Sequence, residues 1–373
     1  MRVEDLKDKL IVISSNEPWD GMKFLKHHYA TEFAKYAKVI FIDPAVEYSP
    51  SKVFSSGIQI KKVEDNIDLL TYTNQIPSVA LDHFMFHLND YLNTLKLRQF
   101  FKSNYSDKEI IFWQFDPFRW VNISKHINLH KIYHVCDPYN HFPTDKLIAA
   151  DAEIIVCTSD NFLEDYKAFN KPLLHIPHGV LPKDLKTDQD ATYEIKTQYG
   201  EFMILAGTIN DTVDIQLAND LMDNLPNETL LICGMIEIND SKHQELYNSL
   251  LEKDNVHYIG VLSPKELGNF VSASKLCLAI YSQERVNNLP NKRQSLLKFT
   301  SYLAQFKPIL ATQRSEMDHL QGNSIYYADS RAEFIELAKR LFVEKDSLDK
   351  EKVSAYLKDV SYKNLINKVI SHF

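Results

Sequence analysis

Two aspartates in the first half of the chain combine a group that can move protons with a backbone fixed by proline. Asp116 and Asp137 each follow a short apolar run and precede a proline. A carboxylate held at the end of a strand can accept a proton from a hydroxyl group as a general base. An aspartate before proline also starts ordinary turns, which is at least as good an interpretation of either residue alone. For the pair, we expect at least one catalytic member.

A second group of candidates is cationic and lies in the last third of the chain. Lys298 falls in the first half of a predicted helix, and Arg285 precedes that helix across a loop that contains Asn287 and Asn288. Lysine is a mobile point charge suited to a phosphate group. Cationic side chains beside a helix N-terminus form a diphosphate site. A solvated basic loop is the alternative, and the position after a predicted strand favours function for Lys298.

Glycine closes three successive predicted strands, although the chain holds only 9 glycines. These residues are Gly207, Gly234 and Gly260. Glycine at a strand end lets a ligand approach the backbone closely. Thr208 and Asn210 follow the first of these glycines, and Val261 follows the last. We therefore include Gly207, Thr208, Asn210 and Val261 among the candidate ligand contacts.

The histidines and the remaining acidic residues give weaker signals. His178 follows Pro177 and either contacts a phosphate or substrate hydroxyl or is a hinge histidine bonded to the backbone, with equal weight for both. His83 and His87 have the i, i+4 spacing of metal ligands, but no third ligand is apparent nearby in the sequence. The Asp188–Asp190 triplet falls in a polar stretch rather than at a strand end. We expect no metal site.

These residues require a scaffold in which strand ends meet, and the hydrophobic pattern predicts one. Short continuous apolar runs alternate with helical stretches, and we predict strands at Lys9–Ser14, Ile58–Val63 and Phe202–Ala206 among others. Continuous runs are typical of parallel strands covered on both faces, and the alternation is typical of doubly wound α/β domains. We predict a first domain at 1–182, a linker at 183–200, a second domain at 201–345 and C-terminal helices at 346–373. Ligands bind beyond the carboxyl ends of such strands, so we expect a cleft between the domains.

The composition excludes several classes of protein. The chain has 373 residues, enough for two domains, with a net charge of −8 and a pI near 6.0, which argues against a general nucleic-acid binder. It contains no G-x-G-x-x-G, so a nicotinamide-dependent oxidoreductase is disfavoured. The four isolated cysteines and the N-terminus without a signal-peptide pattern indicate a cytoplasmic protein. A peripheral contact with the inner face of a membrane is retained as an alternative.

The stretch 295–312, SLLKFTSYLAQFKPILAT, resembles a signature of GT-B glycosyltransferases. That signature reads Pro-x-Lys-Leu-x-Glu-Tyr-Leu-Ala-x-Gly-Lys-Pro-Val-Val-Ala-Thr and lies in the second domain of bacterial polysaccharide-building members related to the glycogen-synthase-like group, or group 1. Shorter segments resemble the same family in the same order along nearly the whole chain. They are 19–21, 132–137, 176–180, 205–214 and 255–260.

The resemblance implies a GT-B architecture. Two Rossmann-like doubly wound domains would face a cleft, and a C-terminal helix would cross back to the first domain. The implied activity is that of a metal-independent hexosyltransferase without a cofactor. It would move a sugar from a nucleotide-diphosphate sugar to a saccharide or lipid-linked saccharide acceptor in cell-surface polysaccharide synthesis.

The resemblance also implies roles for individual residues. Lys298 would pair with the donor diphosphate, and Ser301 stands where the family has the glutamate that holds the donor ribose. The other donor contacts would be Gly207, Thr208, Asn210, Val261, Arg285, Asn287 and Asn288. Acceptor contacts would be Trp19, Asp20, Gly21 and His178. An inverting enzyme would use Asp137 or Asp116 as its base, and a retaining enzyme would need no separate base.

Two alternatives keep the fold and change the activity. A serine at position 301 cannot grip two hydroxyl groups as a carboxylate does, so a weakly active or inactive binding subunit is the first alternative. A sugar-nucleotide epimerase of GT-B fold is the second; such an enzyme needs acid–base groups on both faces of the sugar and converts the donor without an acceptor.

Overall fold

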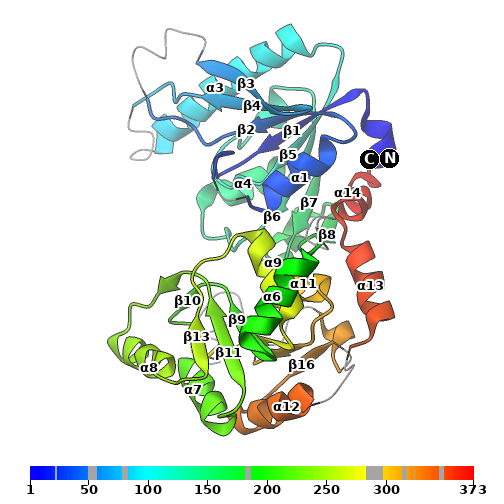
Figure 1. The fold of residues 1–373 in the computed structure, drawn as a ribbon. Helices are drawn as coiled ribbons and strands as arrows, with labels where there is room; N and C mark the ends of the chain where they lie inside the picture. The colour runs from blue at the N-terminus through cyan, green and yellow to red at the C-terminus, as the bar shows by residue number, and fades with distance from the viewer. Residues whose placement is uncertain are drawn as a thin grey trace. The chain divides into compact units, whose positions relative to one another are not determined.

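A computed structural model describes residues 1–21, 23–48, 57–77, 83–180, 186–282, 297–312, 317–322, 324–343 and 348–373. The chain forms two compact α/β units (Figure 1). The first unit holds Met1–Pro177 together with Tyr362–Phe373, and the second holds His178–Ser361. Arg285, Asn287 and Asn288 lie outside the described residues.

The first unit is built on one large sheet. Its strands are β1 (Lys9–Ser14), β2 (Lys38–Ile42), β3 (Ile58–Glu64), β4 (Ile67–Tyr72), β5 (Glu109–Gln114), β6 (His130–Val135), β7 (Ile154–Cys157) and β8 (Leu173–His175). They are ordered β3-β4-β2-β1-β5-β6-β7-β8, and every pair is parallel except β3 with β4. The buried apolar runs of β1 and β5 occupy the centre, as expected for strands covered on both faces.

The first unit also contains helices and short 3₁₀ helices, most of which connect these strands. They are η1 (Val3–Leu6), α1 (Leu25–Phe33), α3 (His83–Asn104), η2 (Ile123–Lys125), α4 (Pro143–Asp151), η3 (Asp160–Phe162), α5 (Leu163–Tyr166), η4 (Lys167–Phe169) and α14 (Tyr362–Ile370). Among the residues that the structure describes, no helix is both long enough and apolar enough to cross a bilayer.

One strand of the first unit does not pair with its neighbour in the parallel direction that was predicted. Ile58–Val63 was expected within a parallel sheet, but β3 forms an antiparallel hairpin with β4, which the sequence did not reveal. Asn66 adopts a left-handed backbone (φ +62°) in the turn between the two strands. Most residues of β3 are exposed and include Lys61 and Lys62, and such charges protect the edge of a sheet from pairing with another chain.

The second unit is also a doubly wound α/β structure. Its main strands are β9 (Phe202–Ala206), β11 (Thr229–Cys233), β13 (Val256–Tyr258), β14 (Leu276–Ala279), β15 (Ile309–Ala311) and β16 (Ile325–Tyr327). They are all parallel and ordered β13-β11-β9-β14-β15-β16, beside a short parallel pair of β10 (Ile209–Asn210) and β12 (Ile236–Glu237).

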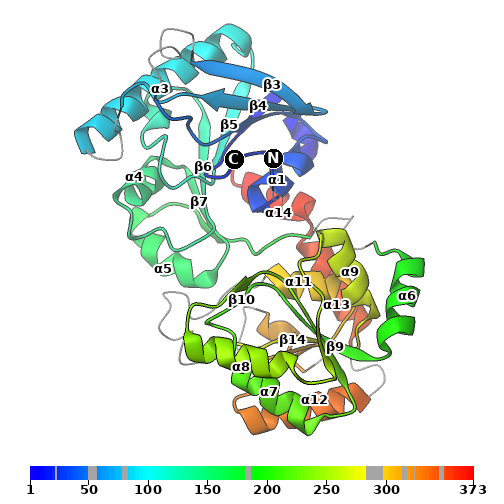
Figure 2. The same ribbon diagram turned by 60° about the vertical axis from the view of Figure 1, so that its left-hand side comes forward.

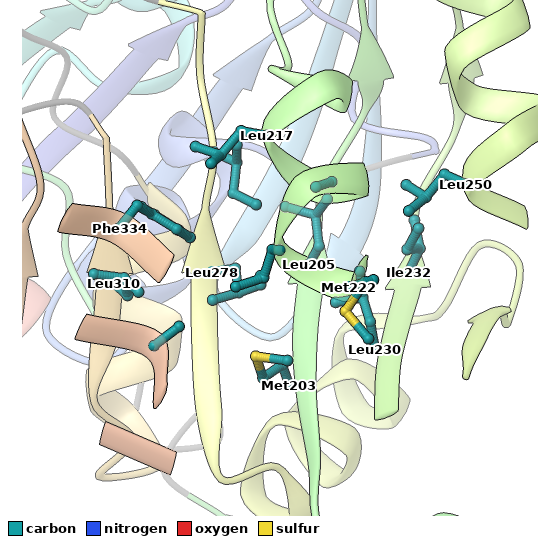
Figure 3. Close-up of a cluster of buried hydrophobic side chains, with 14 of the residues drawn as sticks. Met203, Leu205, Leu217, Met222, Leu230, Ile232, Leu250, Leu278, Leu310 and Phe334 are labelled. Atoms are coloured by element: carbon teal, nitrogen blue, oxygen red, sulfur yellow. The ribbon is translucent and has the colours of Figure 1, made fainter. Parts of the chain in front are cut away.

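The helices of the second unit lie on both faces of this sheet. They are α6 (Gln189–Tyr199), α7 (Ile215–Asn224), α8 (Ser241–Leu251), α9 (Pro264–Ala273), α11 (Leu297–Ala304), η6 (Asp318–Leu320), α12 (Arg331–Val343) and α13 (Lys350–Asp359). Figure 2 shows α6 and α9 on the opposite side of the strands from α7 and α12. In Figure 3, Leu217 of α7, Leu250 of α8 and Phe334 of α12 point at buried aliphatic side chains of the strands.

The predicted linker, 183–200, is largely a helix. Its residues from Gln189 to Tyr199 form α6, which packs on α9. Asp188 caps the helix by accepting hydrogen bonds from the amides of Asp190 and Ala191, and Gly200 follows its end. No residue of α6 is buried, so the stretch lacked the apolar period that would have indicated a helix.

The C-terminal helix returns to the first unit, as predicted. The amide of Val3 donates to Oδ1 of Asn367 (2.8 Å), and the ring of Tyr362 lies 5.2 Å from that of Tyr29. The returning segment is shorter than the predicted range 346–373, because α13 belongs to the second unit.

Phe306 ends α11 in a conformation that suits glycine. Its φ is +53°, its amide donates to the carbonyl of Leu303 (2.9 Å), and the amide of Lys307 donates to that of Tyr302 (3.2 Å). These two bonds form a Schellman motif, in which the left-handed residue is usually glycine. Phe306 stands where the family signature has its glycine.

We therefore predict that Phe306→Gly stabilises the protein. Because the left-handed backbone strains a residue with a Cβ, we expect the free energy of unfolding to rise by about 1 kcal/mol in urea titrations. Gln305→Gly is the matched control, since Gln305 is not among the residues with positive φ, and it should destabilise. Equal loss of stability in both variants would contradict the prediction.

Candidate functional site

Lys298 lies at the topological switch point of the second unit. The chain runs from β9 outward to β13 and then crosses, through α9, to β14 on the other side of β9. The Nζ of Lys298 is 3.4 Å from the carbonyl oxygen of Ala206, the last residue of β9, and 4.5 Å from the ring centre of Tyr281, just beyond β14. Ligands of doubly wound sheets bind at this point, beyond the carboxyl ends of the strands.

The ammonium group of Lys298 contacts only uncharged groups among the described residues. No carboxylate of the described residues forms an ion pair with its ammonium group. Burial raises the pKa of the nearby Cys233 thiol to about 12, and the charge of Lys298 only partly opposes this shift. Within the described part of the chain, the cation is therefore available to an anionic ligand.

Hydrogen bonds fix the two strand ends that flank Lys298. The amide of Tyr281 donates to Oγ1 of Thr312 (2.7 Å), and that hydroxyl donates to the carbonyl of Tyr281 (2.8 Å). The phenol oxygen of Tyr302 lies 3.3 Å from the amide nitrogen and 3.5 Å from the carbonyl oxygen of Ala206. Burial raises the pKa of Tyr302 well above its ordinary value, so this phenol stays neutral.

The three glycines at the strand ends form a backbone ladder. The amide of Gly207 donates to the carbonyl of Cys233, and the amide of Gly234 donates to that of Gly260, both at 2.9 Å. All three glycines have positive φ, between +82° and +132°. A Cβ at Gly234 would lie 2.0 Å from the carbonyl oxygen of Gly207. Glycine is therefore required at position 234 by the packing of the backbone. Gly207 is exposed, and its lack of a side chain leaves space beside Lys298.

The other predicted donor contacts are placed as follows. The Oδ1 of Asn210 accepts from the amide (3.0 Å) and the hydroxyl (2.6 Å) of Thr212, which commits that oxygen to a turn. Thr208 is half-buried next to Gly207, and Val261 is exposed beyond β13. Ser301 lies one turn along α11 from Lys298 and is half-buried.

In the first unit, Asp116 forms the turn that the sequence left as an alternative. It is fully buried, accepts from the amide of Phe118 (2.8 Å) and is paired with Nε of Arg119. Arg119 was not among the predicted site residues. The i, i+3 spacing of Asp116 and Arg119 was visible in the sequence, but this spacing alone does not show that the chain turns between them. Because its carboxylate is enclosed and neutralised, Asp116 is poorly suited to accept a substrate proton.

Asp137 differs from Asp116 in being exposed. Its Oδ2 accepts from the hydroxyl of Tyr139 at 2.9 Å. Burial raises the pKa of Tyr139, and the charge of Asp137 raises it further, so the phenol remains a donor. Of the two predicted bases, Asp137 has the accessibility that a general base needs.

The predicted acceptor residues have different environments. The ring of Trp19 is buried against Phe41 and His27, with ring centres 4.9 and 5.5 Å away, so it belongs to the core. Asp20 and Gly21 are exposed beside it, and Gly21 has φ +102°. His178 is half-buried at the first position of the second unit.

A buried lysine in the first unit was not anticipated from the sequence. Lys26, in the first turn of α1, is 5% exposed and pairs with Glu17 (2.6 Å) and with Oδ1 of Asn16 (2.7 Å) beyond β1. Burial raises the pKa of the Cys136 thiol, the charge of Lys26 partly opposes this shift, and the charges of Asp137 and Glu17 add to it, which indicates that these charged groups lie near one another around the ends of β1 and β6. A lysine in the first turn of a helix opposes the helix dipole, which is a weak signal of a paired site.

Asp43, beyond β2, carries a shifted pKa that predicts a pH dependence. Burial raises the pKa of Asp43 to about 6, although its Oδ1 accepts from the amide of Trp19 (2.8 Å). The folded state then binds more protons than the unfolded state between the two pKa values. The Asp43 contribution therefore lowers stability as the pH rises from about 4 to about 6.

We expect Asp43→Asn to remove this penalty while keeping the acceptor for Trp19. After allowance for solvent screening, the free energy of unfolding should rise by about 1–2 kcal/mol at pH 7.5 and by nothing at pH 4. Urea titrations at both pH values measure it. Asp65→Asn, at a fully exposed side chain, is the control and should show no pH-dependent gain.

The described residues contain no group of three or more His, Cys, Asp or Glu side chains that could hold a metal ion. His83 and His87 do approach each other, with 3.1 Å between their Nε2 atoms. The absence of a metal from the reaction stays a prediction.

Comparison with known proteins identifies the fold. No protein-family model and no curated protein matches the chain in sequence. Among solved structures, the chain is similar to the E. coli trehalose-phosphate synthase bound with UDP-2-fluoro glucose, at 12% identity, 98% coverage of both chains and TM-score 0.66. It is also similar to the lipopolysaccharide outer core galactosyltransferase WaaB, at 12% identity, 98% and 100% coverage and TM-score 0.60.

A third similar structure has a different activity. It is the UDP-GlcNAc 2-epimerase from Methanocaldococcus jannaschii, at 8% identity, 98% and 100% coverage and TM-score 0.55. All three comparisons span nearly the whole of both chains, and the chain therefore has the GT-B fold, as predicted.

Proposed function

We propose that the protein is a glycosyltransferase that uses a nucleotide-diphosphate sugar as its donor. The observation that carries this proposal is the position of Lys298 at the switch point of the second sheet, with no acidic partner among the described residues. A fixed cation at that point suits a diphosphate, whose negative charge increases as the sugar leaves.

The donor would contact the second unit. The ammonium group of Lys298 would bind the diphosphate, and exposed Gly207 lets a phosphate oxygen approach the backbone. Ser301 would offer its hydroxyl to the ribose. One similar structure is bound with a UDP-sugar analogue and another is of a UDP-GlcNAc 2-epimerase, which supports a nucleotide sugar as the ligand class.

The acceptor would contact the first unit. Exposed Asp137 is our candidate for the base of an inverting reaction, in which it would take the proton of the attacking hydroxyl group. We propose a saccharide or lipid-linked saccharide of a cell-surface polysaccharide as the acceptor, and a peripheral membrane contact would bring the enzyme to a lipid-linked one. The similarity to a lipopolysaccharide galactosyltransferase supports this class of acceptor.

A thermal-shift panel of nucleotides and nucleotide sugars tests the proposal. A ligand that binds only the folded state raises the unfolding temperature as its concentration exceeds its Kd. We expect stabilisation by at least one nucleoside diphosphate and its sugar, followed by slow release of free sugar from that donor in water. No stabilisation by any nucleotide would contradict the proposal, and binding without sugar release would identify a binding subunit.

The epimerase is retained as a second candidate because a structure of that activity is similar over the whole chain. Incubation of the binding sugar nucleotide without acceptor separates the two. A transferase hydrolyses the donor slowly and forms no isomeric sugar nucleotide, whereas an epimerase converts the donor into an isomer that ion-exchange chromatography and NMR distinguish.

A further inference from the structure

We infer that Tyr281 positions the ammonium group of Lys298 and thereby sets the affinity for the donor diphosphate. This role rests on the proposed function. The sequence placed Tyr281 at the end of a predicted strand but gave it no role; in the structure it lies just beyond β14.

The contact between the two side chains has the geometry of a cation–π interaction. The Nζ of Lys298 lies 4.5 Å from the centre of the Tyr281 ring, within the roughly 6 Å over which a ring attracts a cation. The second contact, to the carbonyl oxygen of Ala206, is long for a hydrogen bond at 3.4 Å. The ring is therefore an important restraint on a side chain that otherwise has many rotamers.

The backbone beneath the ring is fixed from several directions. Oγ1 of Thr312 bonds both the amide and the carbonyl of Tyr281 (2.7 and 2.8 Å), and Tyr281 pairs with Val213 in an antiparallel bridge. The next amide, of Ser282, donates to the carbonyl of Thr212 at 2.8 Å. These bonds tie the residue that carries the ring to two other segments of the unit.

A neutral aromatic ring suits the positioning of Lys298 better than an acidic side chain would. A carboxylate in the place of the ring would hold the lysine more firmly but would neutralise the charge that the diphosphate needs. An aromatic face attracts the ammonium group through its quadrupole and leaves the positive charge uncompensated. Lys298 then meets the ligand in an ordered position, which reduces the entropy lost on binding.

Isothermal titration with UDP and with inorganic pyrophosphate tests the inference on the full chain. Tyr281→Phe keeps the ring face and should leave both Kd values within about 2-fold, whereas Tyr281→Leu removes the face and should raise them about 5- to 30-fold. Tyr281→Met is the second variant, in case the leucine variant does not fold. Near-UV circular dichroism checks folding.

A double-mutant cycle separates positioning from direct contact with the ligand. If Tyr281 acts through the lysine, Tyr281→Leu should have no further effect on the Kd in a Lys298→Ala background. The same 5- to 30-fold loss in that background would overturn the inference, as would an unchanged Kd in Tyr281→Leu itself. If the unmodified protein binds neither probe, the donor site of the proposed function fails first, and the inference fails with it.

Discussion

Lys298→Ala should abolish most of the affinity for the nucleotide donor while leaving the protein folded. A hydrogen bond between charged groups contributes about 1.5–3 kcal/mol, so we expect the Kd for UDP or the preferred nucleotide to rise about 10- to 150-fold. Within the described part of the chain, the end of this half-buried side chain lies against Ala206, Gly207 and Tyr281, so its truncation leaves the fold with little to lose. Titration calorimetry measures the change.

Two further variants show whether charge is the cause. Lys298→Arg keeps the charge and should recover part of the affinity, although the planar guanidinium is a different shape. Lys339→Ala, at a partly exposed lysine of α12 paired with Glu336, removes an equal charge from the same unit and should leave the Kd unchanged. Equal weakening by the Lys298 and Lys339 variants would point to a general electrostatic effect and would remove the argument for a specific site.

Gly234→Ala should be among the most destabilising single substitutions in the second unit. Its Cβ would overlap the carbonyl oxygen of Gly207 at 2.0 Å, on a backbone with φ +132°. The ends of β9 and β11 would have to separate, which strains or breaks the bond from Gly207 to Cys233. We expect a loss of about 3–4 kcal/mol in the free energy of unfolding.

Gly260→Ala is the matched control for this overlap. Its φ is also positive (+82°), but a Cβ there would meet nothing within 4 Å, so only the backbone strain of about 1–2 kcal/mol remains. All three tryptophans, Trp19, Trp113 and Trp120, belong to the first unit. In urea titrations, circular dichroism therefore reports the unfolding of both units, and tryptophan fluorescence reports the unfolding of the first unit. Equal losses in the two variants would show that the predicted overlap relaxes without cost.

Much of the fold could be predicted because its strands are buried on both faces. Lys9–Ser14 and Phe202–Ala206 were predicted with their observed bounds, since a short continuous apolar run between polar segments is typical of a strand inside a parallel sheet. The hairpin of β3 and β4 and the helix α6 could not be predicted in this way. Helix α6 is largely exposed, so the hydrophobic pattern carries little information about it, and the mostly exposed residues of β3 do not show which strand it pairs with.

The candidate site could be predicted only in part, for a related reason. Lys298 was identified because its helix and the following strand leave a clear pattern in one stretch of sequence. The ring of Tyr281, the hydroxyl of Thr312 and the oxygen of Ala206 come from the ends of separate strands, and only the order of the sheet brings them together. The commitment of Asp116 to Arg119 likewise depends on a turn that the spacing of the two residues does not specify.

The return of α14 to the first unit has a consequence for how the protein is made. The helix buries Leu365, Ile366, Val369 and Ile370 at the end of this chain, so the first unit lacks part of its core until these residues have been translated. The second unit is continuous and ends at Ser361, before α14 begins, so it needs none of these residues. The unit that begins at the N-terminus is therefore the last to be completed.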